Sequence, residues 1–372
     1  MRELSQDEKW MKQALILAEK GRPWVSPNPL VGAVIVKHNR FISRGYHAKF
    51  GAPHAEIEAL QKAGNRSRGA TLYVTLEPCS TYGKTPPCTE AIKRAGIKRV
   101  VIGAIDPNPA HRGRAISIFK KNRIGITKWI LEKDVLHQNE AFVKWITKGV
   151  PFVILKMAQS LDGKIASRTG NSRWISGPAA RLWVHHLRSK IDAVLIGKNT
   201  LLRDDPRLTA RNGKITRSPW RIILDPRGES SVSARIFKQS GPVILACSEH
   251  WLRRAVKKYA GQGVTILPLK ERTGKLDLRQ LLKFLGSMGI TSLLVEGGGE
   301  LAGSLIEQGL VDQVKWILAP KIVGGRNAKT SVEGMGTDLL SQAPRIKSVK
   351  MSQLGEDFLF EGYVASSCFQ ES

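Results

Sequence analysis

Three side chains of this sequence have the types and spacing of zinc ligands, and a carboxylate stands beside them. His54 is followed two residues later by Glu56, and eight residues separate Cys79 from Cys88. A catalytic zinc ion takes three protein ligands and keeps its fourth position for water. Glu56 can move the proton of that water, as the corresponding glutamate of zinc deaminases does. The pattern therefore predicts hydrolytic deamination, although two cysteines alone would more often be small buried hydrophobes.

The flanking sequence predicts elements that bring these ligands together. Residues 71–76 are β-branched and apolar enough for a buried strand, which Pro78 ends just before Cys79. A helix is expected to begin at Cys88, where the helix dipole favours a thiolate. Pro53 precedes another helical stretch. We therefore expect the metal to lie between two helix N-termini.

The chain length and one segment near its middle indicate two domains. A chain of 372 residues is too long for one ordinary core. Residues 139–145 look helical, Gly149 can end that helix, and Pro151 precedes a new apolar strand. Short strands alternate with helical segments on both sides, so both parts are expected to be α/β. We place the domains at residues 1–148 and 149–372.

Cysteine usage points to a reducing compartment. Of four cysteines, only Cys247 and Cys368 lie outside the zinc pattern, and they make no disulfide framework.

The N-terminus has a capping box at Ser5 and Glu8 that opens an amphipathic helix, and it lacks the apolar core of a signal peptide. No segment approaches a membrane span. We expect a cytoplasmic protein without a membrane partner.

The net charge is strongly positive but evenly spread. Lys and Arg total 59 against 31 acidic residues, a formal charge of +28, which could indicate a nucleic-acid partner. However, residues 1–149 hold 26 basic and 12 acidic residues, and residues 150–372 hold 33 and 19. A polyanion-binding arm would be lopsided. General surface basicity, with some cations for a phosphorylated substrate, is therefore favoured over nucleic-acid binding.

A glycine-rich turn in the second part could approach a phosphate. Residues 292–296 are expected to form a strand and residues 300–306 a helix, with three glycines at 297–299 between them. Such a turn exposes backbone N–H groups at a helix N-terminus. It is not the G-x-G-x-x-G fingerprint, and a tight turn that needs positive φ is an equally good interpretation.

Further motifs extend along nearly the whole chain. In the first part they are Ser26-Pro27-Asn28-Pro29-Leu30-Val31-Gly32, Gly45-Tyr46-His47, His54-Ala55-Glu56, Glu77-Pro78-Cys79-Ser80, Gly83-Lys84-Thr85-Pro86-Pro87-Cys88 and Asp106-Pro107-Asn108-Pro109. In the second part they are Lys156-Met157-Ala158-Gln159-Ser160-Leu161-Asp162-Gly163, Trp174-Ile175-Ser176, Leu187-Arg188, residues 197–200, Asp204-Asp205-Pro206, Leu208-Thr209, Arg211 and Val295-Glu296-Gly297-Gly298. With these motifs the chain resembles the bifunctional deaminase–reductases of riboflavin biosynthesis. The resemblance implies an N-terminal cytidine-deaminase-like three-layer α/β/α domain and a C-terminal dihydrofolate-reductase-like α/β domain.

The same resemblance implies roles for individual residues. One Zn²⁺ would be bound by His54, Cys79 and Cys88, and Glu56 would shuttle protons. The implied substrate contacts are Asn28, His47, Lys84, Lys156, Ser172, Arg188, Leu208, Arg211 and Glu296. The implied NADPH contacts are Ala158, Trp174, Thr200, Asp204, Gly298, Gly299, Glu300, Leu301, Ala302, Gly303 and Ser304. The family deaminates a phosphoribosylated diaminopyrimidine, reduces its ribosyl chain with NADPH, and suggests a homo-oligomer.

Several of these residues also have simpler interpretations. His47 could be a core histidine, and Arg188 and Arg211 could be solvated surface cations. Lys156 lies in an apolar strand, where an anionic substrate would explain it, but a snorkelling lysine at a sheet edge is the alternative. Trp174 is as well explained by a core position as by a cofactor platform. Glu296 precedes three glycines, which have no side chains to cover its carboxylate. This favours a polar contact with a ligand over a surface role.

The sequence departs from the family pattern at a few positions near the deaminase site. Thr81 stands two residues after the first zinc cysteine, where a histidine is usual, which removes one imidazole from the substrate's surroundings. His111 and Ala115 replace the usual valine and glycine. We therefore expect metal binding to be retained, and the loop after Asn108 to differ in its path.

Two rival functions come from other classes of protein. A nucleic-acid base deaminase would share the zinc chemistry and explain the basic charge, but those enzymes typically place two residues between their cysteines. They also have no use for the second half of the chain. A zinc-stabilised binding module would have no need of Glu56 beside an open coordination position. Release of ammonia that depends on zinc would separate the enzyme from the module.

Overall fold

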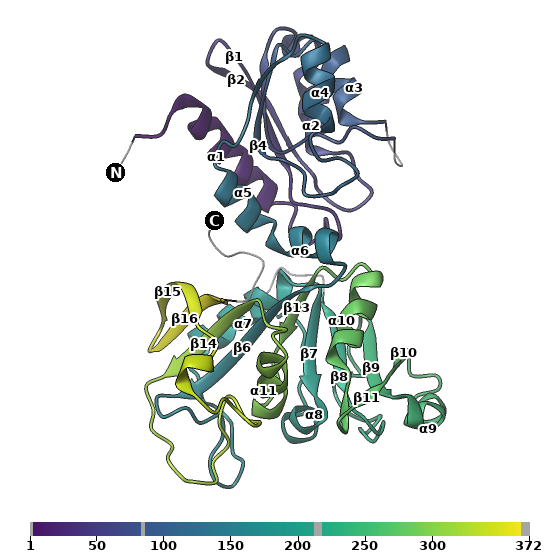
Figure 1. Cartoon of the computed structure of the whole chain (residues 1–372), viewed down its shortest axis with the longest axis vertical. Coiled ribbons are helices and arrows are strands. Elements are labelled where there is room, and N and C mark those ends of the chain that lie inside the picture. The colour runs from purple at the N-terminus through teal and green to yellow at the C-terminus, as the bar shows by residue number, and fades with distance from the viewer. Residues whose placement is uncertain (1–2, 83–85, 212–217, 366–372) are drawn as a thin grey trace. The chain divides into compact units, whose positions relative to one another are not determined.

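The computed structural model describes residues 3–82, 86–211 and 218–365. Its packing divides the chain into two compact units, Met1–Gly149 and Val150–Ser372. Figure 1 shows the elements of unit 1 from purple to dark teal and those of unit 2 from teal to yellow. Lys84, an expected substrate contact, lies outside the described residues. No helix within those residues combines the length and apolar character that a membrane crossing requires.

Unit 1 contains one five-stranded sheet with helices on both faces (Figure 1). The strands are β1 (Gly32–Lys37), β2 (Arg40–Tyr46), β3 (Thr71–Leu76), β4 (Arg99–Ala104) and β5 (Gly125–Thr127). The helices are α1 (Gln6–Glu19), α2 (Ala55–Ala63), α3 (Cys88–Arg94), α4 (Arg114–Lys121), α5 (Glu132–Gln138) and α6 (Glu140–Lys148), with a 3₁₀ turn at Gly64–Ser67. The order across the sheet is β2-β1-β3-β4-β5; β1 is antiparallel to both neighbours, and β3, β4 and β5 are parallel.

Alternation along the strands of unit 1 explains the three layers. In β1, Ala33 and Ile35 pack with the apolar faces of α2, α3 and α4, whereas Val34 and Val36 pack against α1. Successive side chains of a strand point to opposite faces, so a strand that is apolar throughout must be covered on both sides. The expected capping box is present, with the Ser5 hydroxyl accepting from the backbone of Glu8 and the Glu8 carboxylate accepting from that of Ser5.

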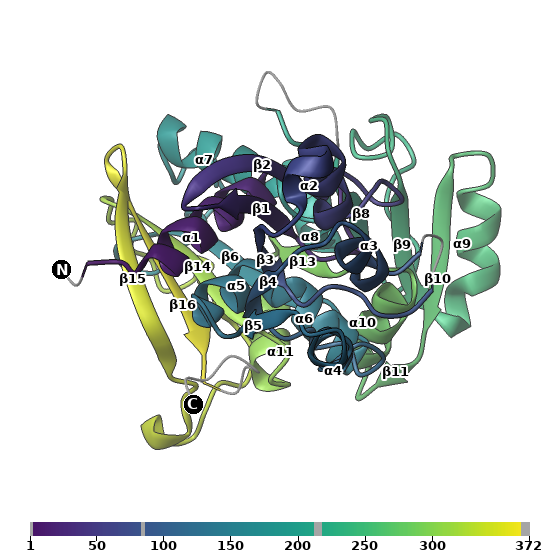
Figure 2. The same ribbon diagram turned by 90° about the horizontal axis from the view of Figure 1, so that it is seen from above.

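Unit 2 is built on a nine-stranded sheet in the order β10-β9-β8-β7-β13-β6-β14-β16-β15. The strands are β6 (Phe152–Ser160), β7 (Ala193–Gly197), β8 (Trp220–Leu224), β9 (Val243–Ser248), β10 (Val264–Leu269), β13 (Ser292–Val295), β14 (Gln313–Ala319), β15 (Ile346–Leu354) and β16 (Asp357–Val364), and a small hairpin joins β11 (Glu271–Arg272) to β12 (Lys275–Leu276). The helices are α7 (Pro178–Ser189), α8 (Lys198–Asp204), α9 (Leu252–Lys258), α10 (Leu278–Ser287) and α11 (Gly299–Glu307), with 3₁₀ turns at Glu249–Trp251 and Leu340–Gln342. Neighbouring strands are parallel from β10 to β14, and the C-terminal pair β16 and β15 is antiparallel. Figure 2 shows β10 and β15 at opposite edges of this sheet.

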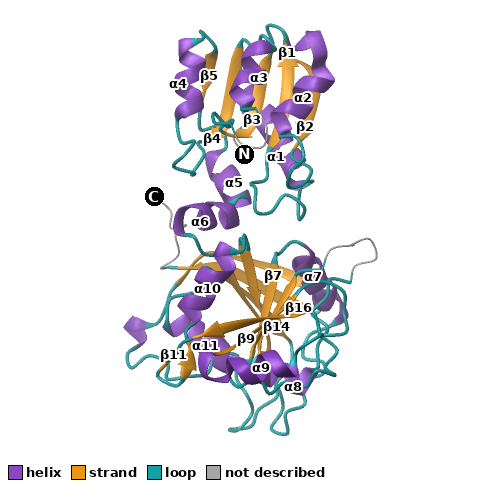
Figure 3. Cartoon of the chain, turned by 90° about the vertical axis from the view of Figure 1, so that its right-hand side faces the viewer, coloured by secondary structure: helices purple, strands orange, loops and turns teal. Residues whose placement is uncertain are grey.

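The helices of unit 2 cover both faces of the parallel strands. Helices α10 and α11 lie on one face and α7 on the other (Figure 3). Leu281, Leu285 and Leu305 pack on the first face, and Val184 packs on the second. Strands buried on both faces read as continuous apolar runs, as β7 and β9 do. The C-terminal ends of β6, β7 and β13, which are neighbours in the sheet order, therefore meet at one edge.

Candidate functional site

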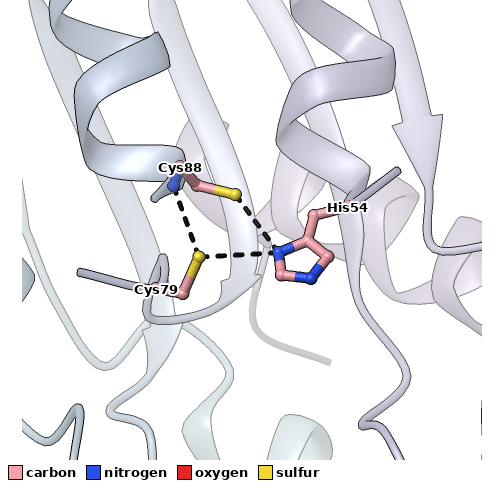
Figure 4. Close-up of side chains that lie close together, drawn as sticks. All are labelled: His54, Cys79 and Cys88. Carbon is pink, nitrogen blue, oxygen red and sulfur yellow. Dashed lines mark hydrogen bonds between the residues drawn. The ribbon is translucent and has the colours of Figure 1, made fainter. Parts of the chain in front are cut away.

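His54, Cys79 and Cys88 converge in unit 1 from three different elements (Figure 4). His54 is the N-cap of α2, Cys88 is the first residue of α3, and Cys79 follows the end of β3. The His54 Nδ1 lies 3.5 Å from the Cys79 Sγ and 3.3 Å from the Cys88 Sγ. The three donor atoms lie within 4.8 Å of one another. The expected position between two helix N-termini is therefore found.

The separations between these donor atoms fit a zinc ion. Ligand bonds of about 2.0 Å to nitrogen and about 2.3 Å to sulfur, at a tetrahedral angle, place the two donors about 3.5 Å apart. The observed distances of 3.5 and 3.3 Å are close to that value. One imidazole and two thiolates also form a donor set that suits zinc and leaves one of four positions for a further ligand.

The two cysteines share their charge unequally. Hydrogen bonding from Cys88, with help from His54, holds the pKa of Cys79 far below its usual range. The Cys79 thiolate in turn raises the pKa of His54 to about 9. Cys79 and burial raise the pKa of Cys88 above its usual value. A cluster that holds one thiolate and resists a second is one in which a bound cation would displace protons.

Glu56 lies in the first turn of α2, two residues after the histidine ligand, and it is only 3% exposed. Burial raises the pKa of this carboxyl to about 7, and the nearby His54 opposes the effect. A carboxyl that titrates near neutrality can both take up and release a proton at physiological pH. This property is required of the general acid and base that the sequence assigned to Glu56.

The buried His47 and the half-buried Asn28 form a pair, and the His47 ring lies 5.4 Å from that of His54. The His47 Nδ1 lies 3.1 Å from the carbonyl oxygen of Pro53, and its Nε2 lies 3.1 Å from the Asn28 Nδ2. A neutral imidazole satisfies both by donating from Nδ1 and accepting at Nε2. Burial and His54 lower the pKa of His47, which also favours the neutral form. His47 is thus buried like a core histidine and still hydrogen-bonded to a second expected substrate residue.

The structure brings two of the departures from the family pattern into contact. The Thr81 Oγ1 lies 3.3 Å from the Nδ1 of His111. An imidazole therefore lies beside position 81 after all, carried by the loop that follows β4. His111, 30 positions further along the chain, brings that imidazole, and the loss of a substrate contact at position 81 stays a prediction.

Glu77 is a residue whose role the sequence did not reveal beyond its place in a motif. Its buried carboxylate accepts backbone hydrogen bonds from Gly113 at 2.8 Å, Ala115 at 3.0 Å and Asp106 at 3.3 Å. The loop between β4 and α4 is thus fixed to the residue that directly follows β3. A glutamate between a buried strand and a Pro-Cys pair is expected to be buried, and a buried carboxylate needs hydrogen-bond donors. The sequence could have indicated this role for Glu77 on that ground.

Unit 2 contains a cavity of about 1070 Å³ at the ends of its parallel strands. Most of the residues expected to contact substrate or NADPH line it, namely Lys156, Ala158, Ser172, Trp174, Arg188, Thr200, Asp204, Leu208, Arg211, Glu296, Gly298, Gly299, Glu300, Leu301 and Ser304. Ala302 and Gly303 do not, because the helical period turns both toward the interior. A side chain at Gly303 would collide with the carbonyl oxygen of Glu333.

An ion-paired glutamate, Glu296, is part of this cavity lining. The Glu296 carboxylate accepts from the Arg188 Nε at 2.5 Å and Nη2 at 2.9 Å, and from the Lys156 Nζ at 3.2 Å. Burial would raise the pKa of Glu296, but Arg188 and Lys156 outweigh burial and hold it at about 2. Lys156 belongs to β6, which has a neighbour on each side, so it is not a lysine at a sheet edge.

The glycine turn after β13 does not depend on positive φ. None of the three glycines at 297–299 has a φ in that region. A side chain at Gly298 would meet only the Thr200 Oγ1, at 3.8 Å, whereas one at Gly299 would collide with the carbonyl oxygen of Thr330. Gly298 therefore leaves space open toward the cavity, and Gly299 is needed for close packing.

Other polar contacts organise the same cavity lining. The Ser172 hydroxyl donates to the Asp204 carboxylate at 3.1 Å. Trp174 is 64% exposed, and the guanidinium of Arg181 lies 4.4 Å from its ring centre. Trp174 is therefore not a core residue. His185 and Arg181, which also line the cavity, were not singled out from the sequence.

Comparison with known proteins identifies the family. Residues 4–104 match the cytidine and deoxycytidylate deaminase zinc-binding region, and residues 151–360 match the RibD C-terminal domain. The riboflavin biosynthesis protein RibD of Aquifex aeolicus (strain VF5) is 40% identical over 354 residues, which cover 95% of this chain and 97% of that protein. The chain belongs to the RibD family of riboflavin biosynthesis proteins.

Solved structures of RibD proteins agree with this assignment. The Acinetobacter baumannii RibD is 36% identical, covers 98% of this chain and 100% of its own, and superposes with a TM-score of 0.88. The Thermotoga maritima deaminase/reductase is 38% identical, with coverages of 97% and 99% and a TM-score of 0.87. The predicted fold class and the prediction of a bifunctional deaminase–reductase of riboflavin biosynthesis are thereby confirmed.

Proposed function

We propose that unit 1 hydrolytically deaminates 2,5-diamino-6-(5-phosphoribosylamino)pyrimidin-4(3H)-one, and that unit 2 then reduces the ribosyl chain with NADPH. The product would be 5-amino-6-(5-phosphoribitylamino)uracil. The Thermotoga maritima relative is described as a diaminohydroxyphosphoribosylaminopyrimidine deaminase and 5-amino-6-(5-phosphoribosylamino)uracil reductase. The observation that carries the proposal is the convergence of His54, Cys79 and Cys88 beside the buried Glu56.

In the deaminase half, the protein's own contribution is to hold and move one proton. Zinc, when bound by the three ligands, would supply Lewis-acid activation of water. The Glu56 carboxylate takes a proton and returns it to the departing amine, which its pKa near 7 allows in both directions. His47 and Asn28 present a neutral, hydrogen-bonded pair for the pyrimidine or its ribose phosphate. Lys84 remains a prediction for the same role.

In the reductase half, the residues bind, orient and exclude water. NADPH, when bound, would supply the hydride. The glycine turn and the N-terminus of α11 offer backbone N–H groups and a favourable potential for its phosphates, with Thr200, Asp204 and Trp174 beside them in the cavity lining. Arg188 and Lys156, held by Glu296, face the substrate, and Arg211 would bind the substrate phosphate.

The two halves would act in separate sites of one chain, with unit 1 as the deaminase domain and unit 2 as the reductase domain. Cytoplasmic location and a homo-oligomeric state remain predictions from the sequence and the family. A small-molecule substrate would account for the polar residues gathered around His54 in unit 1 and around Glu296 in unit 2. We propose no role for nucleic acid.

A direct test supplies the phosphoribosylated diaminopyrimidine to purified protein with and without NADPH, and follows ammonia release and NADPH oxidation separately. We expect ammonia in both reactions and NADPH oxidation only after deamination. Removal of zinc with a chelator should stop ammonia release and spare reduction of the deaminated substrate. Protein that contains no zinc and takes none up, or that releases no ammonia when zinc is present, would contradict the deaminase assignment.

A further inference from the structure

His185 connects two segments of the cavity lining in unit 2. It lies on α7, three residues before Arg188, and faces the cavity. Its Nδ1 lies 3.2 Å from the carbonyl oxygen of Thr209 and 3.3 Å from the backbone nitrogen of Arg211. Its Nε2 lies 3.4 Å from the Nη2 of Arg211. The imidazole therefore bridges α7 and the segment 209–211.

Only one state of this imidazole satisfies both the Thr209 carbonyl and the Arg211 guanidinium. The Thr209 carbonyl can only accept, and the Arg211 guanidinium can only donate. A neutral ring with its proton on Nδ1 donates to Thr209 at 3.2 Å and accepts from the guanidinium at Nε2, and it gives up only the longer contact in which the Arg211 backbone N–H donates to Nδ1 at 3.3 Å. The other neutral form would turn an N–H toward the guanidinium and a lone pair toward the carbonyl. A protonated ring would place two donors, and two positive charges, against each other.

The charges around His185 also favour the neutral ring. Burial lowers its pKa, and Arg188 and Arg211 lower it further, against opposing effects of the Thr209 carbonyl and Glu296. Arg188 is already held by both oxygens of Glu296. No carboxylate of the described residues pairs with Arg211, whose pKa is lowered by burial and by the nearby arginines 188, 207 and 235. Arg211 is thus a cation without an anion, in a cluster of cations, held by a neutral imidazole.

We propose that His185 is a positioning residue that holds the Arg211 guanidinium ready for the phosphate of the reductase substrate. This inference rests on the proposed function, in which Arg211 binds that phosphate. A free arginine must lose side-chain freedom when it binds a ligand, and a hydrogen bond that fixes it beforehand lowers that cost. His185 does not touch the reacting atoms, so its effect should fall on binding and not on hydride transfer.

Substitution of His185 by its two amides tests which ring nitrogen matters. The amide of His185→Asn reaches the Nδ1 position and can bond to Thr209 only, whereas that of His185→Gln reaches the Nε2 position beside Arg211. In the intact protein, with the deaminated phosphoribosyl substrate, His185→Asn should raise KM about tenfold, as expected for one lost hydrogen bond to a charged group. Its kcat and its KM for NADPH should hold, and His185→Gln should stay within about threefold of the parent in KM. The control His186→Asn, on the same helix but outside the cavity lining, should match the parent.

A double-mutant cycle with Arg211→Gln decides whether His185 acts through Arg211. We expect Arg211→Gln to raise KM strongly, and His185→Asn to add little in that background, because coupled residues are not additive. Equal effects of His185→Asn in both backgrounds, an unchanged KM, or a fall in kcat with KM unchanged would overturn the role of His185 alone. If Arg211→Gln leaves KM unchanged, the proposed phosphate role of Arg211 fails, and the inference falls with it.

Discussion

Replacing Glu296 by glutamine should destabilise unit 2 at neutral pH, and the destabilisation should shrink as the pH falls. The carboxylate is 7% exposed and accepts three hydrogen bonds from Arg188 and Lys156. Glutamine keeps the size of the side chain but removes its charge, so it leaves two buried cations without their counterion. Breaking a buried pair from one side is costly because the remaining charges are uncompensated.

The magnitude follows from the pKa of Glu296, which is about 2 in the folded protein against an ordinary value of 4.5. Since one pKa unit corresponds to about 1.4 kcal/mol, the charged carboxylate contributes about 3 kcal/mol to stability at neutral pH. A lowered pKa means that this contribution is fully present above the ordinary pKa and is lost as the pH falls toward 2. Between pH 6 and pH 3, about 2 kcal/mol of it should disappear.

The measurement is the free energy of unfolding of the parent and of Glu296→Gln at several pH values between 7 and 3. Hydrogen exchange of β6 and β13 peptides in increasing denaturant reports on unit 2 alone. The control is Glu361→Gln, which removes the partner of Lys315 from a pair on β14 and β16 that is more open to solvent. That change should cost no more than about 1 kcal/mol. A parent-to-variant difference that stays constant from pH 7 to pH 3, or an equal loss in the control, would refute the reasoning.

Three further perturbations probe unit 1. Glu56→Gln should bind zinc normally but release ammonia at least about a hundredfold more slowly, with reduction of the deaminated substrate retained; loss of both activities would contradict independent sites. His111→Val should raise the deaminase KM about fivefold by removing the contact with Thr81. Adding Thr81→His to that variant should recover part of the loss. Steady-state ammonia release at fixed zinc content measures both effects. Phe119→Ala, at a fully buried position of α4, should lower the free energy of unfolding of unit 1 by about 3–5 kcal/mol in denaturant titrations, and a loss under about 1 kcal/mol would contradict its core position.

The convergence of the three expected zinc ligands was predictable because it is set by local structure. The strand at 71–76 and the helix that begins at Cys88 were both expected at the residues where they occur. Each ligand stands at an element boundary that proline and apolar runs mark in the sequence. Once those boundaries are known, few arrangements are open to the three donors.

The contacts of the reductase cavity were less predictable because they depend on the strand order. Lys156 and Glu296 are 140 residues apart, and they meet only because β13 inserts between β7 and β6. The sequence indicated that Lys156 needs an anion, but it suggested a substrate where the fold supplies a carboxylate. His185 gave no signal at all, since a histidine on an amphipathic helix has no pattern that distinguishes it. The prediction of a positive φ in the glycine turn was wrong. Gly298 leaves open space, and Gly299 allows close packing that a side chain would prevent.

In each unit, a glutamate that directly follows a buried strand holds groups from other elements in place. Glu77 follows β3 and accepts three backbone N–H groups, two from the loop before α4, including that of Gly113, and one from the first turn of α4. Glu296 follows β13 and accepts three N–H groups from Arg188 and Lys156. Carboxyl ends of neighbouring parallel strands meet at one sheet edge, so an acceptor there can reach groups from other elements that also end at that edge. The reach of these two acidic residues is therefore a consequence of parallel topology: Glu77 fixes backbone groups around the start of α4, and Glu296 holds two cations of the cavity lining.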